Sequence, residues 1–102
     1  MKSRREILSS ISKNKDLTGF EKKVYKAALA IPSGQVRSYK WVATRIGNSG
    51  SCRAVGTALN KNPYAPIVPC HRVIKSDGSL GGFAMGRKAK ERLLKREGID
   101  LR

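Results

Sequence analysis

One short segment decides how the chain is organised: Ile67-Val68-Pro69-Cys70-His71-Arg72-Val73. Apolar residues and a proline lead into a cysteine, which is followed directly by the single histidine of the chain. The apolar run predicts a buried strand, and the proline restricts the backbone just before the thiol. A cysteine in this setting is either a small buried hydrophobic residue or a nucleophile with a base nearby, and the rest of the chain must decide between them.

The chain is strongly basic. Its 102 residues include 22 Lys and Arg against 7 Asp and Glu, which gives a formal net charge of +15. No acidic residue lies between Glu21 and Asp77. The length fits one domain, and the charge favours a polyanionic partner, nucleic acid rather than a membrane. A basic surface that serves only solubility is the alternative.

Several classes of protein are disfavoured by what the sequence lacks. No apolar run approaches the length of a membrane span, and no secretory signal pattern follows Met1, so no membrane association is expected. Two cysteines and one histidine cannot supply the four ligands of a structural zinc site, and we expect neither a metal nor a cofactor. Cys52 and Cys70 are expected to be reduced, in a cytoplasmic protein.

Capping residues and stop signals predict a mainly α fold with five helices. The first follows Ser3 and is broken by residues 14–17, and the second begins at Thr18. Ser38 and Ser51 are expected to cap the third and fourth helices, and Gly98 to end the fifth. The expected helices therefore cover about 4–13, 18–30, 39–46, the stretch from Ser51 to Asn62-Pro63, and 87–97.

The third and fourth helices are joined by a Gly-containing turn in the most basic part of the chain, which favours a helix-turn-helix. Asp77-Gly78 predicts a hairpin between residues 73–75 and 79–80, which would form a wing. An ordinary helical hairpin is the alternative to a DNA-binding motif.

The fourth helix presents small side chains, with Arg53 as its one long side chain. A helix that reads the major groove usually presents long hydrogen-bonding residues, so this surface suits close approach to a narrow groove instead. Tight packing of the helix within the core is the alternative. The small residues are Cys52, Ala54, Gly56, Thr57 and Ala58.

A cysteine acts as a thiolate, and a thiol with an ordinary pKa near 8.5 is only about 3% ionised at pH 7. A transfer reaction at Cys70 therefore needs a base. Neighbouring residues on a strand point to opposite faces, so His71 is not expected to contact the Cys70 sulfur directly. Either the backbone turns at this point or a water molecule relays the proton.

Several segments together closely resemble the O6-alkylguanine-DNA alkyltransferases, which are also called methylated-DNA–protein-cysteine methyltransferases. The resemblance covers roughly Phe20 to Leu101. In that family the target nucleotide is flipped out of the duplex, and its alkyl group passes from guanine O6 to the active cysteine in one irreversible step. The matching segments are PCHRV at 69–73, RAVGTALNKNP at 53–63, SY at 38–39, GGFAMG at 81–86 and KERLLKREGI at 90–99.

The resemblance implies a helical bundle with a winged helix-turn-helix and a small β element that carries the active-site cysteine. It also implies a form without the N-terminal domain that most members carry: residues 1–17 would be a short helical extension and residues 18–102 the DNA-binding and catalytic domain. By position, Cys70 matches the alkyl acceptor, His71 the water-mediated base and Glu97 the carboxylate that orients His71. No metal ligand is implied.

The resemblance assigns DNA contacts to a second group of residues. Tyr39 matches the tyrosine that donates to the flipped base, Arg53 the arginine that fills the vacated stack, and Asn62 the asparagine at the hinge between recognition helix and active-site segment. Small residues pack into the minor groove: Ser51, Cys52, Ala54 and Gly56. Backbone groups bind the guanine edge at Cys70, Val73 and Ala84.

The expected partner is double-stranded DNA that contains O6-alkylguanine, bound by a monomer. One alternative is an alkyltransferase-like protein, which binds alkylated DNA and recruits other repair without transfer. The presence of Cys70 argues for transfer, and the missing N-terminal domain keeps this alternative open. A second alternative is a winged-helix regulator with a structural cysteine, which would need no pairing of Glu97 with His71.

Overall fold

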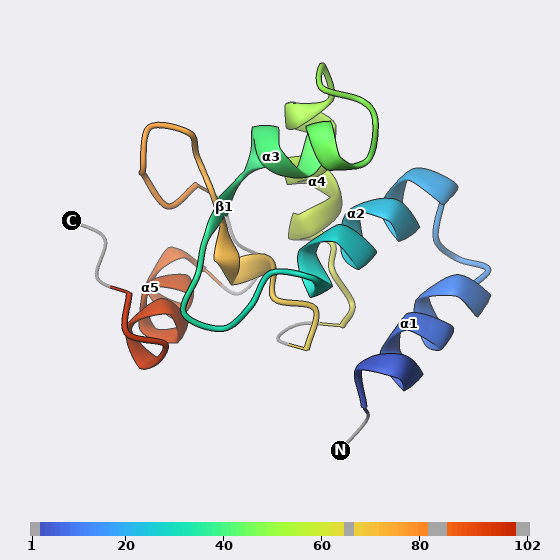
Figure 1. Ribbon diagram of the computed structural model, residues 1–102, viewed down its shortest axis with the longest axis horizontal. Coiled ribbons are helices and arrows are strands. Elements are labelled where there is room, and N and C mark those ends of the chain that lie inside the picture. Colours follow the sequence, from blue (N-terminus) through green and yellow to red (C-terminus); the bar gives the residue numbers. More distant parts are fainter. Residues whose placement is uncertain (1–2, 65–66, 82–85, 100–102) are drawn as a thin grey trace.

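The protein is described here by a computed structural model that covers residues 3–64, 67–81 and 86–99. Helices dominate the described residues, with one small parallel sheet, which confirms the predicted fold class (Figure 1). In chain order the elements are α1 (Arg4–Lys13), α2 (Gly19–Leu29), β1 (Arg37–Ser38), α3 (Tyr39–Arg45), α4 (Cys52–Asn60), the 3₁₀ helix η1 (Cys70–Arg72), β2 (Val73–Ile74) and α5 (Arg87–Arg96).

The first three helices begin where the capping signals predict. Ser3 and Thr18 form capping boxes. The side-chain oxygen of each accepts from the backbone N–H of the glutamate three residues on, and that glutamate's side chain accepts from the N–H of the capping residue. Ser38 Oγ likewise accepts from the Trp41 N–H at 2.9 Å. Ser51 differs, because its Oγ donates to the Asn48 carbonyl at 2.6 Å instead of capping α4. Its backbone is not in the extended region that an N-cap requires.

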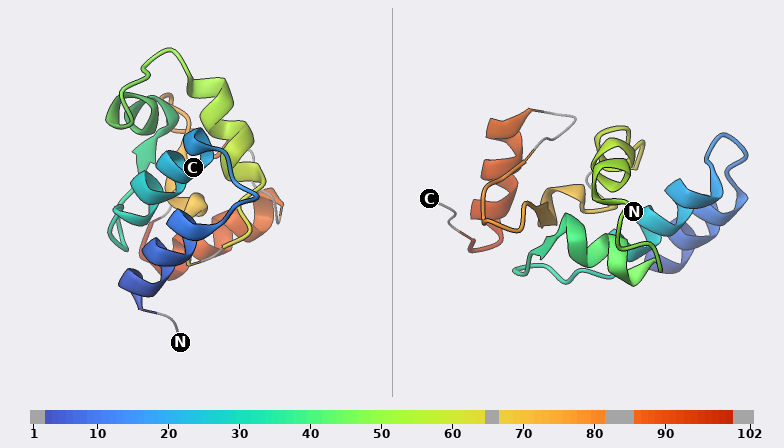
Figure 2. Two further views of the ribbon diagram at one scale, coloured as in Figure 1. Left: turned by 90° about the vertical axis from the view of Figure 1, so that its right-hand side faces the viewer. Right: turned by 90° about the horizontal axis from the view of Figure 1, so that it is seen from above.

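One main core joins the helices that precede the active-site segment. Ile7 and Ile11 of α1 are buried against α2, so the first helix shares the core of the following helices. Tyr25 of α2 is fully buried, and its hydroxyl donates to the Ala58 carbonyl of α4 at 2.7 Å. α5 lies at the opposite end of the molecule from α1 (Figures 1 and 2). Among the described residues, no helix is long and apolar enough to cross a membrane.

The predicted helix pair is present. α3 and α4 pack on each other and on α2, and Gly47, with a φ of 80°, lies in the turn that follows α3. The Asn48 N–H donates to the Ala43 carbonyl at 2.9 Å and closes the end of the helix. The two helices therefore pack as one unit against α2 and the main core.

The strand predicted over Ile67–Val73 is wrong for most of its length. The Cys70 N–H donates to the Val68 carbonyl at 2.8 Å across Pro69, whose φ of −82° and ψ of 67° are those of an inverse γ-turn. The chain then makes one turn of 3₁₀ helix, η1, in which the Arg72 N–H donates to the Pro69 carbonyl at 2.9 Å. The cysteine thus precedes the β element and does not lie within it.

The β element also differs from the predicted hairpin. β2 pairs in parallel with β1, with Arg37 opposite Val73 and Ser38 opposite Ile74. The turn at Asp77-Gly78 is present: the Gly78 N–H donates to the Lys75 carbonyl at 3.0 Å, and the Lys75 N–H donates to the Ser79 carbonyl at 2.9 Å. Residues 79–80 are not a strand, so the sheet of the described residues ties η1 to the start of α3.

Replacing Ile11 by alanine tests whether α1 belongs to the core. Ile11 is fully buried, so Ile11→Ala should lower the free energy of unfolding by about 2–5 kcal/mol, whereas Ser9→Ala on the exposed face of α1 should change it by less than about 0.5 kcal/mol. Urea unfolding followed by circular dichroism measures both. An Ile11→Ala protein as stable as Ser9→Ala would show that α1 is dispensable for the fold.

Candidate active site

Cys70 lies at the start of η1, where its side chain is only 3% exposed. Burial raises the pKa of the Cys70 thiol, and a hydrogen bond from the Asn62 side chain and the nearby Lys90 ammonium oppose this rise. The effect of burial on the pKa outweighs the two opposing effects, so Cys70 is a protonated thiol at neutral pH. A reaction at this sulfur therefore requires a base close by.

Asn62 links the end of α4 to the segment that carries the thiol. It is buried, its Nδ2 donates to the Val68 carbonyl at 2.9 Å, and its Oδ1 accepts from the Tyr64 N–H at 2.9 Å. The amide thus bridges two backbone segments on either side of residues 65–66. This geometry fits the hinge position predicted for Asn62.

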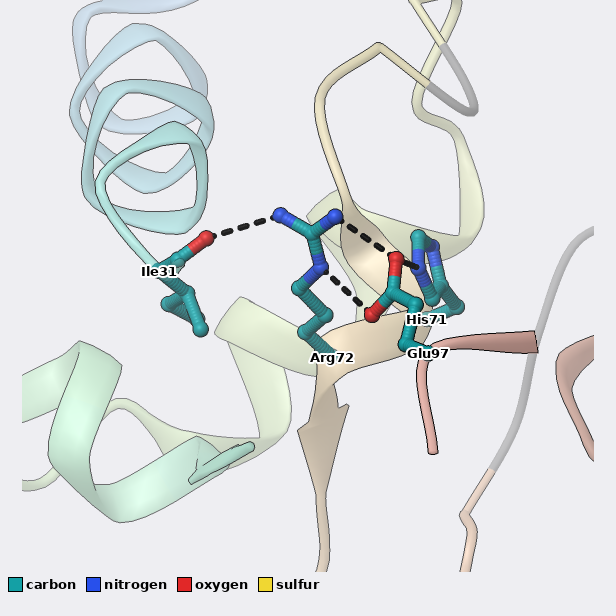
Figure 3. Close-up of polar contacts among 4 residues, drawn as sticks. All are labelled: Ile31, His71, Arg72 and Glu97. Atoms are coloured by element: carbon teal, nitrogen blue, oxygen red, sulfur yellow. Dashed lines mark hydrogen bonds and ion pairs between the residues drawn. The ribbon is translucent and has the colours of Figure 1, made fainter. Parts of the chain in front are cut away.

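His71, Arg72 and Glu97 form one hydrogen-bonded cluster (Figure 3). His71 is 2% exposed, and its Nε2 lies 3.0 Å from Oε2 of Glu97. The predicted pairing of these two residues is therefore present in the structure. Arg72, to which the sequence reasoning gave no role, donates to both carboxylate oxygens, Nε to Oε1 at 2.9 Å and Nη2 to Oε2 at 2.6 Å.

The charges of the cluster fix the direction of the histidine hydrogen bond. The paired Arg72 guanidinium holds the pKa of Glu97 at about 2, with a smaller contribution from His71, so the carboxylate only accepts. Burial lowers the pKa of His71, and Glu97 opposes this, so the imidazole is neutral at pH 7. Nε2 must then carry the proton, and Nδ1 is the acceptor. Nδ1 is buried and has no hydrogen-bond partner among the described residues.

The end of α5 places Glu97 opposite η1. Gly98 has a φ of 84°, its N–H donates to the Lys95 carbonyl at 3.0 Å, and the Ile99 N–H donates to the Leu94 carbonyl at 3.0 Å. These two bonds define the Schellman motif predicted from Gly98 and Ile99. Glu97 is the C-cap residue of this motif, so the local backbone fixes where its side chain leaves the helix.

Lys90 is a second site residue that sequence reasoning missed. It is fully buried, and its ammonium donates to the Val73 carbonyl at 2.6 Å and to the Leu80 carbonyl at 2.5 Å. It also lies 3.4 Å from the Tyr39 hydroxyl, and burial lowers the pKa of Lys90 to about 8. The spacing of Lys90 and buried Leu94, four residues apart on α5, was the available signal.

An open hollow of about 500 Å³ lies between Tyr39, helix α4 and the turn after β2. Tyr39 is half-buried, and burial raises the pKa of its hydroxyl. A side chain at Gly81 would approach the Tyr39 hydroxyl to 2.7 Å, so glycine is required there for the tyrosine to sit as it does. The described lining residues are Tyr39, Cys52, Arg53, Gly56, Thr57, Asn60, Lys75 and Gly81.

Four of the predicted DNA-contacting residues line this hollow: Tyr39, Cys52, Arg53 and Gly56. Arg53 and Ala54 are exposed on the first turn of α4, which half-buried Ser51 precedes. The backbone of Val73 is predicted to bind the guanine edge, and in the structure its carbonyl accepts from the Lys90 ammonium. Ala84 lies outside the described residues.

A protein-family model described as the DNA-binding domain of 6-O-methylguanine DNA methyltransferase matches residues 19–99. The chain belongs to this family. The resemblance found in the sequence is therefore confirmed. Methylated-DNA–protein-cysteine methyltransferase from Methanosarcina barkeri is 54% identical over 85 residues, which are 83% of this chain and 54% of that protein. The same-named Mycobacterium tuberculosis protein is 50% identical over 80 residues, covering 78% of this chain and 48% of that protein.

Solved structures of similar proteins agree with the fold. Mycobacterium tuberculosis OGT in complex with DNA superposes with a TM-score of 0.79 at 49% identity, covering 80% of this chain and 50% of that chain. Schizosaccharomyces pombe Atl1 in complex with damaged DNA containing O6-carboxymethylguanine gives a TM-score of 0.73 at 34% identity, covering 79% of this chain and 77% of that one. The chain spans about half the length of the curated methyltransferases it matches.

The depressed pKa of Glu97 predicts a pH-dependent contribution to stability. The folded-state pKa of about 2 lies below the ordinary 4.5, so the stabilisation is fully present above about pH 4.5 and is lost as the pH falls towards 2. Glu97→Gln should therefore be less stable than the wild type at pH 7, with a difference that closes between pH 4.5 and pH 2. Urea unfolding at several pH values measures this, and Glu91→Gln on the same helix is the control. A stability difference between wild type and Glu97→Gln that stays constant with pH would contradict the pairing of an ionised Glu97 with Arg72.

Proposed function

We propose that this protein repairs DNA by direct reversal, transferring an alkyl group irreversibly from O6 of a flipped-out guanine to Cys70. The observation that carries the proposal is the buried thiol of Cys70 followed by a neutral histidine that is paired with an ionised carboxylate. A structural cysteine needs no such neighbours. Membership of the methyltransferase family and the names of its curated members support the same conclusion.

The residues of the site supply the proton transfers of this reaction. Nδ1 of His71 takes the thiol proton through a water molecule, while Nε2 stays hydrogen-bonded to Glu97. The Cys70 thiolate attacks the alkyl carbon, a carbon–sulfur bond forms, and the electrons of the breaking carbon–oxygen bond pass to O6. The released guanine takes one proton from the Tyr39 hydroxyl beside Lys90, and the proton that His71 took from the thiol then restores this hydroxyl. One alkyl group and one proton thus change places.

Binding to DNA relies on α4 and the basic surface around it. Exposed Arg53 projects from a helix whose other leading residues are small, which suits entry into the minor groove and occupation of the space left by the flipped base. Flipping costs a few kcal/mol, which phosphate contacts made by the surplus of basic residues offset. The protein is proposed to act as a cytoplasmic monomer on double-stranded DNA, without a cofactor.

Intact mass after incubation with an O6-methylguanine duplex tests the transfer. The protein should gain one methyl group on Cys70, and the amount should stop at one equivalent, because a thioether is a poor leaving group. Cys70→Ala should gain no mass and still bind the duplex, whereas Cys52→Ala, which keeps the Cys70 thiol, should still gain one methyl group. A wild-type protein of unchanged mass that holds the lesion DNA would instead indicate the alkyltransferase-like class, to which the Atl1 complex points.

Replacing Arg53 tests the proposed recognition helix. Arg53→Ala should slow repair of duplex DNA, because an intercalating side chain is lost, while the thiol site stays intact. Lys88→Ala, which removes an exposed cation from the first turn of α5, should have little effect and controls for net charge. Single-turnover repair rates on duplex DNA measure both variants. If Arg53→Ala repairs at the wild-type rate, Arg53 is not the side chain that fills the space left by the flipped base.

A further inference from the structure

We propose that Arg72 is the positioning residue of this site: by gripping both carboxylate oxygens of Glu97, it holds the imidazole of His71 in the tautomer that leaves Nδ1 free to accept a proton. The inference deepens the proposed function and rests on it for its consequence for alkyl transfer. Arg72 does not contact the reacting sulfur in the structure, so its effect passes through Glu97 and His71.

The guanidinium makes three hydrogen bonds, to Glu97 at the end of α5 and to Ile31 after α2 (Figure 3). Nε and Nη2 donate to the two carboxylate oxygens of Glu97 at 2.9 and 2.6 Å, and Nη1 donates to the Ile31 carbonyl at 2.8 Å. A planar guanidinium that meets a carboxylate through two parallel bonds permits one relative orientation, which a lysine ammonium cannot impose. Arg72 therefore ties η1 to the end of α5 and to the residue pair that follows α2.

The carboxylate oxygen nearest the histidine is shared. Oε2 of Glu97 accepts from Nη2 of Arg72 and lies 3.0 Å from Nε2 of His71. Since the carboxylate is ionised, it can only accept, and Nε2 must be the protonated nitrogen. The second ring nitrogen, Nδ1, is then a buried acceptor. Without the bidentate grip, Glu97 at the end of α5 would be free to rotate, and the ring would lose the partner that selects this tautomer.

The same contact pairs the negative charge of Glu97 with the Arg72 cation, while the carboxylate also accepts from the neutral imidazole of His71. The charged groups that face His71 are Glu97 and Lys90 from α5 and Arg72 from its own turn. Glu97 favours protonation of the imidazole, whereas Arg72 and Lys90 disfavour it. A carboxylate paired with Arg72 thus orients the imidazole of His71 while leaving it neutral, ready to accept the thiol proton.

The Ile31 carbonyl gives the arrangement a fixed anchor. Ile31 is buried just beyond the C-terminal end of α2, where the helix dipole favours a nearby cation. This bond joins the catalytic turn to the helix that also supports α4 through Tyr25 and Ala58. Arg72 therefore sets the position of Glu97 relative to the main core and not only relative to α5.

The single histidine of the chain makes a direct test possible, because its imidazole nitrogen signals in NMR belong to His71 without assignment. In wild-type protein at pH 7.5 we expect the Nε2–H tautomer alone. Arg72→Lys, which keeps the charge, and Arg72→Met, which removes it, should each give a mixture of tautomers. Transfer to Cys70 should slow by about 10²-fold, the cost of a misplaced catalytic group. Arg92→Met, which removes an exposed arginine from α5, is the matched control and should match the wild type.

Two results would overturn the proposal. One is a pure Nε2–H tautomer in Arg72→Lys together with the wild-type transfer rate, since the charge alone would then suffice. The other is a slowed Arg72→Met protein that keeps the wild-type tautomer, since loss of stability alone would then explain the rate. The tautomer measurement needs no DNA, so it decides the role of Arg72 even if the wild-type protein transfers nothing. If Arg72→Met does not fold, the tautomer and the transfer rate of Arg72→Lys alone decide the test.

Discussion

The site depends on one carboxylate that serves two partners. Glu97 accepts two hydrogen bonds from the Arg72 guanidinium and one from His71 Nε2. The orientation and the charge state of the imidazole are therefore set together. Burial makes both Cys70 and His71 prefer their uncharged forms. In the proposed reaction, an ionised group must therefore stand close enough to support the imidazolium that would form when the thiol gives up its proton. Because Glu97 is the C-cap of α5, the base depends on where that helix ends.

Much of this arrangement follows from local sequence signals. The capping boxes at Ser3 and Thr18 and the glycine stop at Gly98 were predictable, because each depends on residues within one helical turn. The pairing of His71 with Glu97 was also predicted, but from the family resemblance and not from spacing. No local rule relates two residues 26 positions apart.

What sequence reasoning missed arises from tertiary structure. The apolar run before Cys70 has the composition of a strand, yet the γ-turn at Pro69 ends any strand there and redirects the chain into a 3₁₀ turn. Lys90 and Arg72 appear as surface residues in a basic sequence, because binary patterning treats every cation as polar. Both are held by carbonyl oxygens that no pattern encodes, Val73 and Leu80 for Lys90 and Ile31 for Arg72.

The central claim is that a buried thiol becomes a nucleophile only because His71 is held as a neutral base. The most direct test is the single-turnover rate of methyl transfer to Cys70 as a function of pH, in wild type and in His71→Asn. The account predicts that the wild-type rate falls on the acid side as the imidazole protonates, with a midpoint below the ordinary pKa of 6.5. His71→Asn should lose this acid limb and be about 10²–10⁴-fold slower at pH 7. A His71→Asn protein that transfers at the wild-type rate across the pH range would contradict it.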